Sequence, residues 1–218
     1  RLMQVARDTY CKTMIALGYN AQSEAVLRSH KWVSLGSINR FHKLLFPGNA
    51  TKEISRLAPA RHLANLAYAP LRPRVSKLSS INDGRLREVT RFDSAFDELW
   101  IDASRQWPCA IVRNSRFLEW QFMKQPFKRY DVLGYYEGDR LVGYVVLFFR
   151  KPERGRPSPK AAISDICYSG AGSREIIDGR LEGALRLAIE RRAGSLVTDV
   201  LDPRVEQGLS RLGFWRIK

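Results

Sequence analysis

The chain has 218 residues, 44% of them hydrophobic and 11% aromatic, so it can bury a substantial core and is not a disordered segment. Its 37 basic and 22 acidic residues give a net charge of +15, which favours phosphate-bearing ligands but is also typical of an ordinary basic soluble protein. Three cysteines without paired spacing argue against a disulfide scaffold, and no apolar run reaches the roughly 20 residues that span a bilayer, so we expect a cytoplasmic protein.

The first 46 residues predict the end of an α/β unit. A helix leads into a short apolar strand at 13–17, Asn20 caps a helix from Ala21 to Ser29, and a strand is expected over 32–37, leading towards Phe41. Pro47-Gly48-Asn49 breaks this pattern. Residues 47–84 contain three further prolines and are interpreted as a linker with one or two short helices.

Residues 85–218 predict a complete unit with the element order β-α-α-β-β-β-α-β-α-β. Two of its helices carry recognisable start signals, a capping Ser94 and a proline in the first turn at Pro203. The fold class is therefore α/β, a mixed and mostly antiparallel sheet flanked by helices. The expected strands are 86–91, 130–136, 141–149, 161–168, 196–201 and 214–217, and the expected helices are 93–106, 116–124, 175–192 and 203–212.

The ending of the second unit repeats the ending of the first. Aligning Asn20 with Asp202 brings Leu27 onto Leu209 and Trp32 onto Phe214. Each segment then reads as a strand, a capping residue, a helix, and an aromatic residue at the start of a closing strand. This pattern indicates a duplicated unit.

The element order resembles that of the GNAT superfamily of N-acyltransferases, which often ends in N-x-x-A-x-x-L-Y-x-x-x-G-F. The places of that motif are held here by Asp202, Val205, Gly208, Leu209, Gly213 and Phe214. The second half also looks like the C-terminal half of tandem GNAT-like, FemAB-type proteins. The resemblance implies a complete GNAT-like domain over 85–218, a linker over 47–84, and an incomplete tail of a first GNAT-like domain over 1–46.

The same resemblance implies acetyl-CoA or another acyl-CoA as co-substrate, held where the strand ending at Tyr168 turns into a helix. GNAT enzymes use Q/R-x-x-G-x-G/A there, because glycines let the backbone approach the pyrophosphate. Cys167 stands where a basic residue or Gln is usual, and an ordinary strand-to-helix turn is the alternative. The candidate cofactor-binding residues are Ile166, Cys167, Tyr168, Gly170, Ala171, Gly172, Ser173 and Arg174.

Two carboxylates are candidates for the general base, Asp165 and Glu119, although a carboxylate at a strand end more often caps a turn. The tyrosine that family members often use as general acid is replaced by Leu209. Arg113, Trp120 and Tyr130 are candidates for a substrate groove, with a core position as the alternative for Trp120. The three histidines lack metal-ligand spacing, so we expect no metal.

These residues lead to three hypotheses. The first is an acyl-CoA-dependent N-acyltransferase that acts on a small amine or amino-sugar acceptor, together with a missing N-terminal GNAT-like half or a second chain. The second is a non-catalytic GNAT-like module that binds a substrate or partner. The third, permitted by the charge alone, is a nucleic-acid-binding protein, although no recognition motif supports it. We expect no membrane partner.

Overall fold

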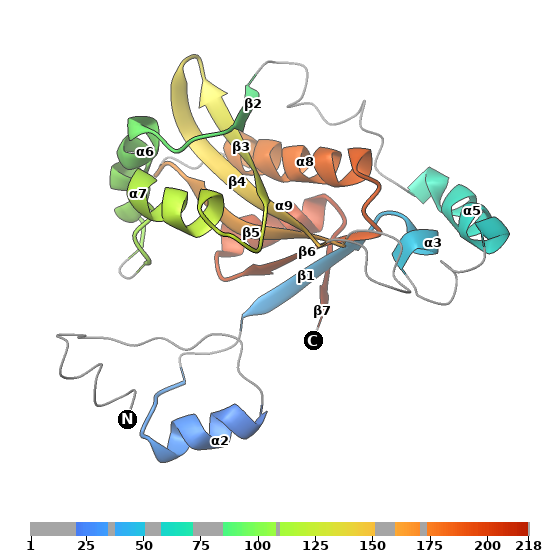
Figure 1. The fold of residues 1–218 in the computed structure, drawn as a ribbon, viewed down its shortest axis with the longest axis horizontal. Coiled ribbons are helices and arrows are strands. Elements are labelled where there is room, and N and C mark those ends of the chain that lie inside the picture. Colours follow the sequence, from blue (N-terminus) through green and yellow to red (C-terminus); the bar gives the residue numbers. More distant parts are fainter. Residues whose placement is uncertain are drawn as a thin grey trace. The chain divides into compact units, whose positions relative to one another are not determined.

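The computed structural model describes residues 21–34, 38–50, 58–71, 85–107, 110–150, 160–170 and 174–217 (Figure 1). The chain divides into two compact units, Arg1–Ser37 and Ile38–Lys218. The described part of the first unit contains the helix α2 (Ala21–Ser29), as predicted. Within α2, Arg28 pairs with Glu24 one turn earlier at 2.7 Å, an arrangement that stabilises an exposed helix modestly.

The second unit is built on a seven-stranded sheet with the order β2-β3-β4-β5-β6-β1-β7. Neighbouring strands are antiparallel except for the pair β5 and β6, which is parallel. The mixed, mostly antiparallel sheet and the element order of residues 85–218 are thus confirmed. The strands are β1 (Asn39–Leu44), β2 (Leu86–Val89), β3 (Tyr130–Glu137), β4 (Arg140–Arg150), β5 (Lys160–Tyr168), β6 (Ser195–Val200) and β7 (Trp215–Ile217).

Helices flank the sheet at the predicted places. One start signal differs from the expectation: the side chain of Asp93, not Ser94, accepts from the Ala95 backbone N–H, because Asp93 is the residue that still has extended backbone angles. The helices of this unit are α3 (Pro47–Ala50), α5 (Ala58–Ala67), the short 3₁₀ turn η1 (Ala69–Leu71), α6 (Ser94–Ser104), α7 (Ser115–Leu118) with its π-helical continuation η4 (Glu119–Met123), α8 (Arg174–Glu190) and α9 (Pro203–Arg211).

The core forms two clusters, one on each face of the sheet. Because successive strand residues point to opposite faces, Tyr144 and Val146 of β4 pack with α6 and α7, whereas Val145 and Leu147 pack with α8 and α9. Strand β5 divides in the same way, with Cys167 on the α6 face and Tyr168 on the α8 face.

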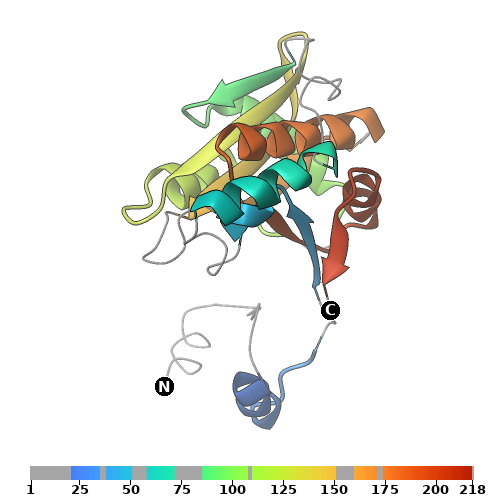
Figure 2. The same ribbon diagram turned by 90° about the vertical axis from the view of Figure 1, so that its right-hand side faces the viewer.

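Strand β1 lies between β6 and β7, and Figure 2 shows it beside β7. The prediction of a strand over 32–37 is wrong for its described part, because residues 32–34 form no strand. Strand pairing with β6 begins only at Asn39, opposite Val200. Strand β1 therefore shares a sheet with the strands of residues 85–217, and the two compact units divide after Ser37. The assignment of 1–46 to a tail, 47–84 to a linker and 85–218 to a complete domain stays a prediction. The origin of residues 1–46 in a first GNAT-like domain stays a prediction, and 1–20 lie outside the described residues.

Across the described residues, no helix combines the length and the apolar character needed to cross a membrane.

Candidate functional site

The parallel strands β5 and β6 separate in the middle of the sheet. Their ladder joins only Ala161–Ile163 to Leu196–Thr198, so residues 164–168 of β5, all of them described, have no partner in β6. The Ser169 N–H donates to the Val142 carbonyl at 3.0 Å, which directs residues 167 and 169 towards β4. Since pairing direction alternates along a strand, the backbone N–H groups of Ile166 and Tyr168 point to the side from which β6 has diverged.

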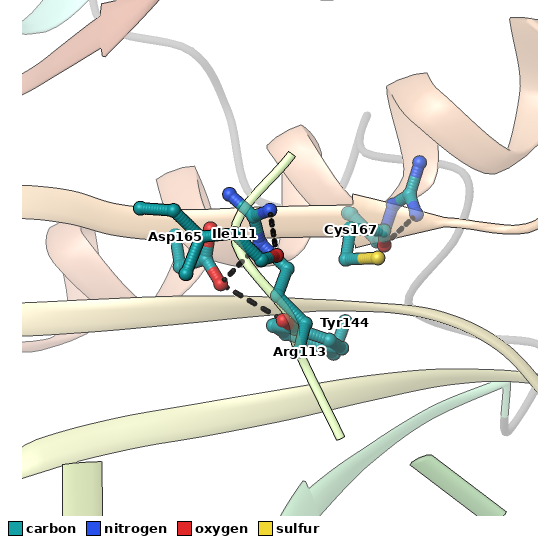
Figure 3. Close-up of polar contacts among 6 residues, drawn as sticks. Ile111, Arg113, Tyr144, Asp165 and Cys167 are labelled. Carbon is teal, nitrogen blue, oxygen red and sulfur yellow. Dashed lines mark hydrogen bonds and ion pairs between the residues drawn. The ribbon is translucent and has the colours of Figure 1, made fainter. Parts of the chain in front are cut away.

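A cluster of Arg113, Asp165 and Tyr144 lies beside this edge, on the α6 face (Figure 3). The Arg113 Nε donates to both carboxylate oxygens of Asp165 at 3.1 Å, and the Tyr144 hydroxyl donates to Asp165 Oδ2 at 2.8 Å. A second guanidinium nitrogen, Nη1, donates to the carbonyl of Ile111 at 3.1 Å. The structure thus joins two sequence-predicted residues, Arg113 and Asp165, although they were assigned to different roles.

The electrostatics of this cluster follow from its burial. Burial acts to lower the pKa of Arg113, but the Asp165 carboxylate outweighs it together with other neighbours, and the net shift is upwards. Burial and then Asp165 raise the pKa of Tyr144 well above its ordinary value. The same two causes raise the pKa of Cys167 from 9.0 to about 12, so this buried thiol is protonated at neutral pH and is a poor nucleophile.

A second polar cluster lies on the other face, at the carboxyl ends of β5 and β6. The Tyr168 hydroxyl donates to Asp202, the residue that caps α9. The Arg204 guanidinium lies 5.0 Å from the Tyr168 ring centre and pairs with Asp202 at 3.1 Å. The hydrogen bond between Tyr168 and Asp202 therefore connects the end of β5 with the residue that follows β6, where the two strands no longer pair through their backbones.

Arg180 of α8 belongs to the same cluster and is fully buried. Its Nη1 donates to the Cys167 carbonyl at 2.5 Å, and its guanidinium lies 4.8 Å from the centre of the Tyr168 ring. Its Nε and Nη2 have no hydrogen-bond partner in the described part of the chain, and no described carboxylate pairs with it. Burial lowers the pKa of Arg180 to about 10, so the group is still charged at neutral pH.

The predicted phosphate loop is described only at its two ends. The Gly170 N–H faces Asp102 Oδ2 of α6 at 3.4 Å. Arg174 begins α8, is exposed, and pairs with Asp178 at 3.4 Å. Ala171, Gly172 and Ser173 lie outside the described residues, so their part in this loop stays a prediction.

The remaining predicted residues make other contacts. Glu119 accepts from the Phe92 N–H at 3.4 Å, and no hydrogen bond or ion pair of the described residues connects it to the Asp165 cluster. Trp120 is 59% exposed, so the core alternative for it is wrong. Tyr130 packs edge-on against Phe122, with ring centres 5.0 Å apart.

Two residues of these clusters were missed from the sequence. Tyr144 lies inside an apolar strand, where the pattern predicts a core position for a tyrosine. Arg180 carried a signal, because it falls on the buried stripe of α8 with Ile176, Ile177 and Ala184. A charged residue on an apolar helical face needs an explanation. Elsewhere in the described part of the chain, no three His, Cys, Asp or Glu side chains gather as a metal site would require.

With its mixed, mostly antiparallel sheet flanked by helices, the second unit has a GNAT-like fold. Among solved structures the chain is similar to N-myristoyltransferase of Saccharomyces cerevisiae, solved with bound myristoyl-CoA and inhibitors, at a TM-score of 0.54 and 9% identity. That match covers 81% of this chain and 45% of the yeast protein, so this chain spans under half of its length.

A conserved protein of unknown function from Staphylococcus epidermidis matches at a TM-score of 0.47 and 13% identity, over 92% of this chain and 65% of that protein. No protein-family model and no curated protein matches the sequence. At such low identity the likeness shows the fold alone.

Proposed function

We propose that this chain is an acyl-CoA-dependent N-acyltransferase, or the acyl-CoA-binding part of one. One observation carries the proposal: β5 and β6 part after Ile163 and Thr198, and the amides of Ile166 and Tyr168 face the side that β6 has left. In open α/β sheets, ligands bind outside the carboxyl ends of the strands, where neighbouring strands diverge. The similar yeast enzyme was solved with an acyl-CoA bound, which supports acyl-CoA as the ligand class.

In the proposed reaction, an acceptor amine attacks the thioester carbonyl carbon. The new C–N bond forms, the C–S bond breaks, the amine loses a proton, and the departing thiolate gains one. The contribution of the chain is to hold both substrates together and to stabilise the negative charge that develops on the carbonyl oxygen. The N–H groups of Ile166 and Tyr168 are the backbone donors that we assign to the acyl-CoA.

The Arg113–Asp165 pair is the proposed acceptor site. The Asp165 carboxylate already accepts from Arg113 and from Tyr144, so both of its oxygens are engaged by side chains of the protein itself. We therefore assign Asp165 first to the positioning of Arg113, and keep it with Glu119 as candidates for the base. Asp165→Asn separates the two roles. If Asp165 is the general base, the variant has a lower kcat and a flatter dependence of kcat on pH. If Asp165 positions Arg113, the variant has a higher KM and keeps the pH dependence of kcat.

Calorimetric titration with acetyl-CoA and with longer acyl-CoAs tests the binding. Release of free thiol in the presence of a panel of small amines and amino sugars tests the transfer. Arg174→Glu, at the start of α8, is expected to weaken acyl-CoA binding about tenfold or more, since it places a negative charge beside the phosphates. Arg216→Glu makes the same charge change at an exposed position of β7 and is the control. A folded chain that binds no acyl-CoA contradicts the proposal.

A second candidate function is a GNAT-like module that binds its ligand without catalysis. It is favoured by the occupied Asp165 carboxylate and by Leu209, which is buried and offers no proton where family members often use tyrosine. Acyl-CoA binding without thiol release, with any acceptor of the panel, would support this alternative over the first.

A further inference from the structure

We propose that the chain binds the surface of an anionic lipid bilayer through one end of its sheet. This end, called the basic end below, is where β3 and β5 begin and where β4 and α8 finish. The inference goes beyond acyl transfer. It also differs from the expectation of no membrane partner, which concerned apolar runs long enough to span a bilayer, because a peripheral surface needs none. The basic end carries six exposed cationic side chains, Lys128, Arg129, Arg150, Lys160, Arg191 and Arg192.

These cations surround the last residues of β4. Lys128 Nζ lies 5.5 Å from the centre of the Phe148 ring, and the Arg191 guanidinium lies 4.6 Å from the centre of the Phe149 ring. Because neighbouring residues of a strand point to opposite faces, the two cations cover this strand end from both sides. Arg150 follows as the final residue of β4. The basic residues therefore gather at one end of the sheet instead of being scattered over its faces.

The positive charge of the basic end is not neutralised within the described part of the chain. Strand register places Arg150 directly opposite Lys160, and like charges in such a position destabilise a sheet. Among the six cations, only Arg191 forms an ion pair with a described carboxylate, that of Asp131 at 2.5 Å. The neighbouring Glu190 pairs with a different arginine of α8 at 3.7 Å. A surface of one sign without internal partners is suited to a polyanion.

The other end of β5 shows that this chain does pair its cations elsewhere. There, Arg113 pairs with Asp165 at 3.1 Å, and Arg204 pairs with Asp202 at 3.1 Å. The two ends of this nine-residue strand are about 25 Å apart. A membrane at the basic end would therefore leave the proposed acyl-CoA site open.

An exposed aromatic residue favours a lipid surface over other polyanions. Phe127 is 93% exposed and stands directly before Lys128. Stable peripheral binding takes two signals, an apolar anchor and basic residues, and these neighbours supply both. Nucleic acid would need free rings on which bases stack, whereas Phe148 and Phe149 already lie beneath cations of the chain itself.

Co-sedimentation of the full chain with lipid vesicles tests the inference. The vesicles contain roughly three parts phosphatidylcholine to one part phosphatidylserine, and pure phosphatidylcholine is the reference. We expect binding to the anionic vesicles alone, weakened by added salt. Arg150→Glu should weaken it about tenfold or more, because it reverses one charge of the surface. The same change puts opposite charges across the ladder from Lys160, so the thermal midpoint should be kept or raised.

Two further variants separate charge at this place from charge in general. Arg105→Glu makes the same reversal at an exposed position beside Gln106, which bonds to the Tyr168 carbonyl at the other end of β5. It should change vesicle binding by less than about twofold. Phe127→Ala changes no charge and should weaken binding about threefold or more, since less apolar surface enters the bilayer interface.

The inference is overturned if neutral and anionic vesicles bind alike, or if Arg150→Glu and Arg105→Glu weaken binding equally. It is also overturned if random duplex DNA binds as tightly as the anionic vesicles and Phe127→Ala affects neither, an outcome that assigns the basic end to nucleic acid. Vesicle binding by a chain that binds no acyl-CoA supports the inference, and in that case the proposed acyltransferase function fails alone.

Discussion

Two arginines approach strand β5 from opposite faces of the sheet, and only one of them has a carboxylate. Arg113 comes from the segment before α7 and pairs with Asp165, so its pKa is raised. Arg180 comes from α8, is fully buried, pairs with no described carboxylate, and its pKa is lowered to about 10. The comparison teaches that a folded chain can hold one buried arginine on a carboxylate and another on a backbone carbonyl and an aromatic ring.

The largest expected effect concerns the complete pair. Asp165→Ala leaves Arg113 and the Tyr144 hydroxyl without their common acceptor in a mostly buried place, and should cost about 3 kcal/mol of unfolding free energy. Urea denaturation measures it. Asp199→Ala is the matched control, because Asp199 also pairs with an arginine, Arg40, but both side chains are about half exposed. Its expected cost is about 0.5 kcal/mol, and equal losses for the two variants would contradict the interpretation.

The two arginines themselves should respond in opposite ways. Arg113→Met leaves the Asp165 carboxylate without its guanidinium partner and should lower the unfolding free energy by about 2 kcal/mol. Arg180→Met should change the unfolding free energy by less than about 1 kcal/mol in the absence of ligand. Chemical denaturation of both variants, under one buffer without phosphate, gives the comparison. A larger loss for Arg180→Met would make it a structural residue and remove the contrast between the two sites.

Gly143→Ala tests whether the space for Arg180 is specific. The added methyl group collides with the guanidinium and lies 2.9 Å from the Cys167 carbonyl oxygen, and overpacking of this kind should cost about 1.5 kcal/mol. Gly170→Ala serves as the control, since its nearest contact would be an ordinary 3.5 Å. Thermal unfolding of both proteins suffices, and a harmless Gly143→Ala would show that Arg180 has room to move.

The smallest effect is a pH dependence on the Arg113 face. Burial and Asp165 raise the Cys167 pKa from 9.0 to about 12, so the folded chain keeps a proton that the unfolded chain loses. The stability due to this proton is fully present below about pH 9 and is lost as the pH rises towards 12. Between pH 9 and 10, wild type should lose about 1 kcal/mol more than Cys167→Val. Parallel curves for the two proteins would show that the thiol is not the titrating group.

The element order of residues 85–218 was predictable from periodicity alone, because its helices and strands carry strong apolar patterns and clear breaks. The hairpin of β3 and β4, for example, turns at Gly138, whose φ of 61° lies in the left-handed region that glycine tolerates. The site was predictable only in part. Asp165 and Arg113 were found one by one, whereas the bond between them joins residues 52 positions apart and appears only on folding.

By itself, the sequence determined the α/β class, the cap at Asp202 and the strand that ends at Tyr168, since these depend on neighbours along the chain. Only the tertiary structure decided that β1 joins the sheet formed by the strands of residues 85–217. It also decided that Gly179 leaves room for Tyr135, and Gly183 for Leu86, to approach α8. It also decided that one arginine is paired and the other is not. The reason is physical: local propensity acts over a few residues, whereas burial and charge pairing depend on groups that meet only when distant strands pack.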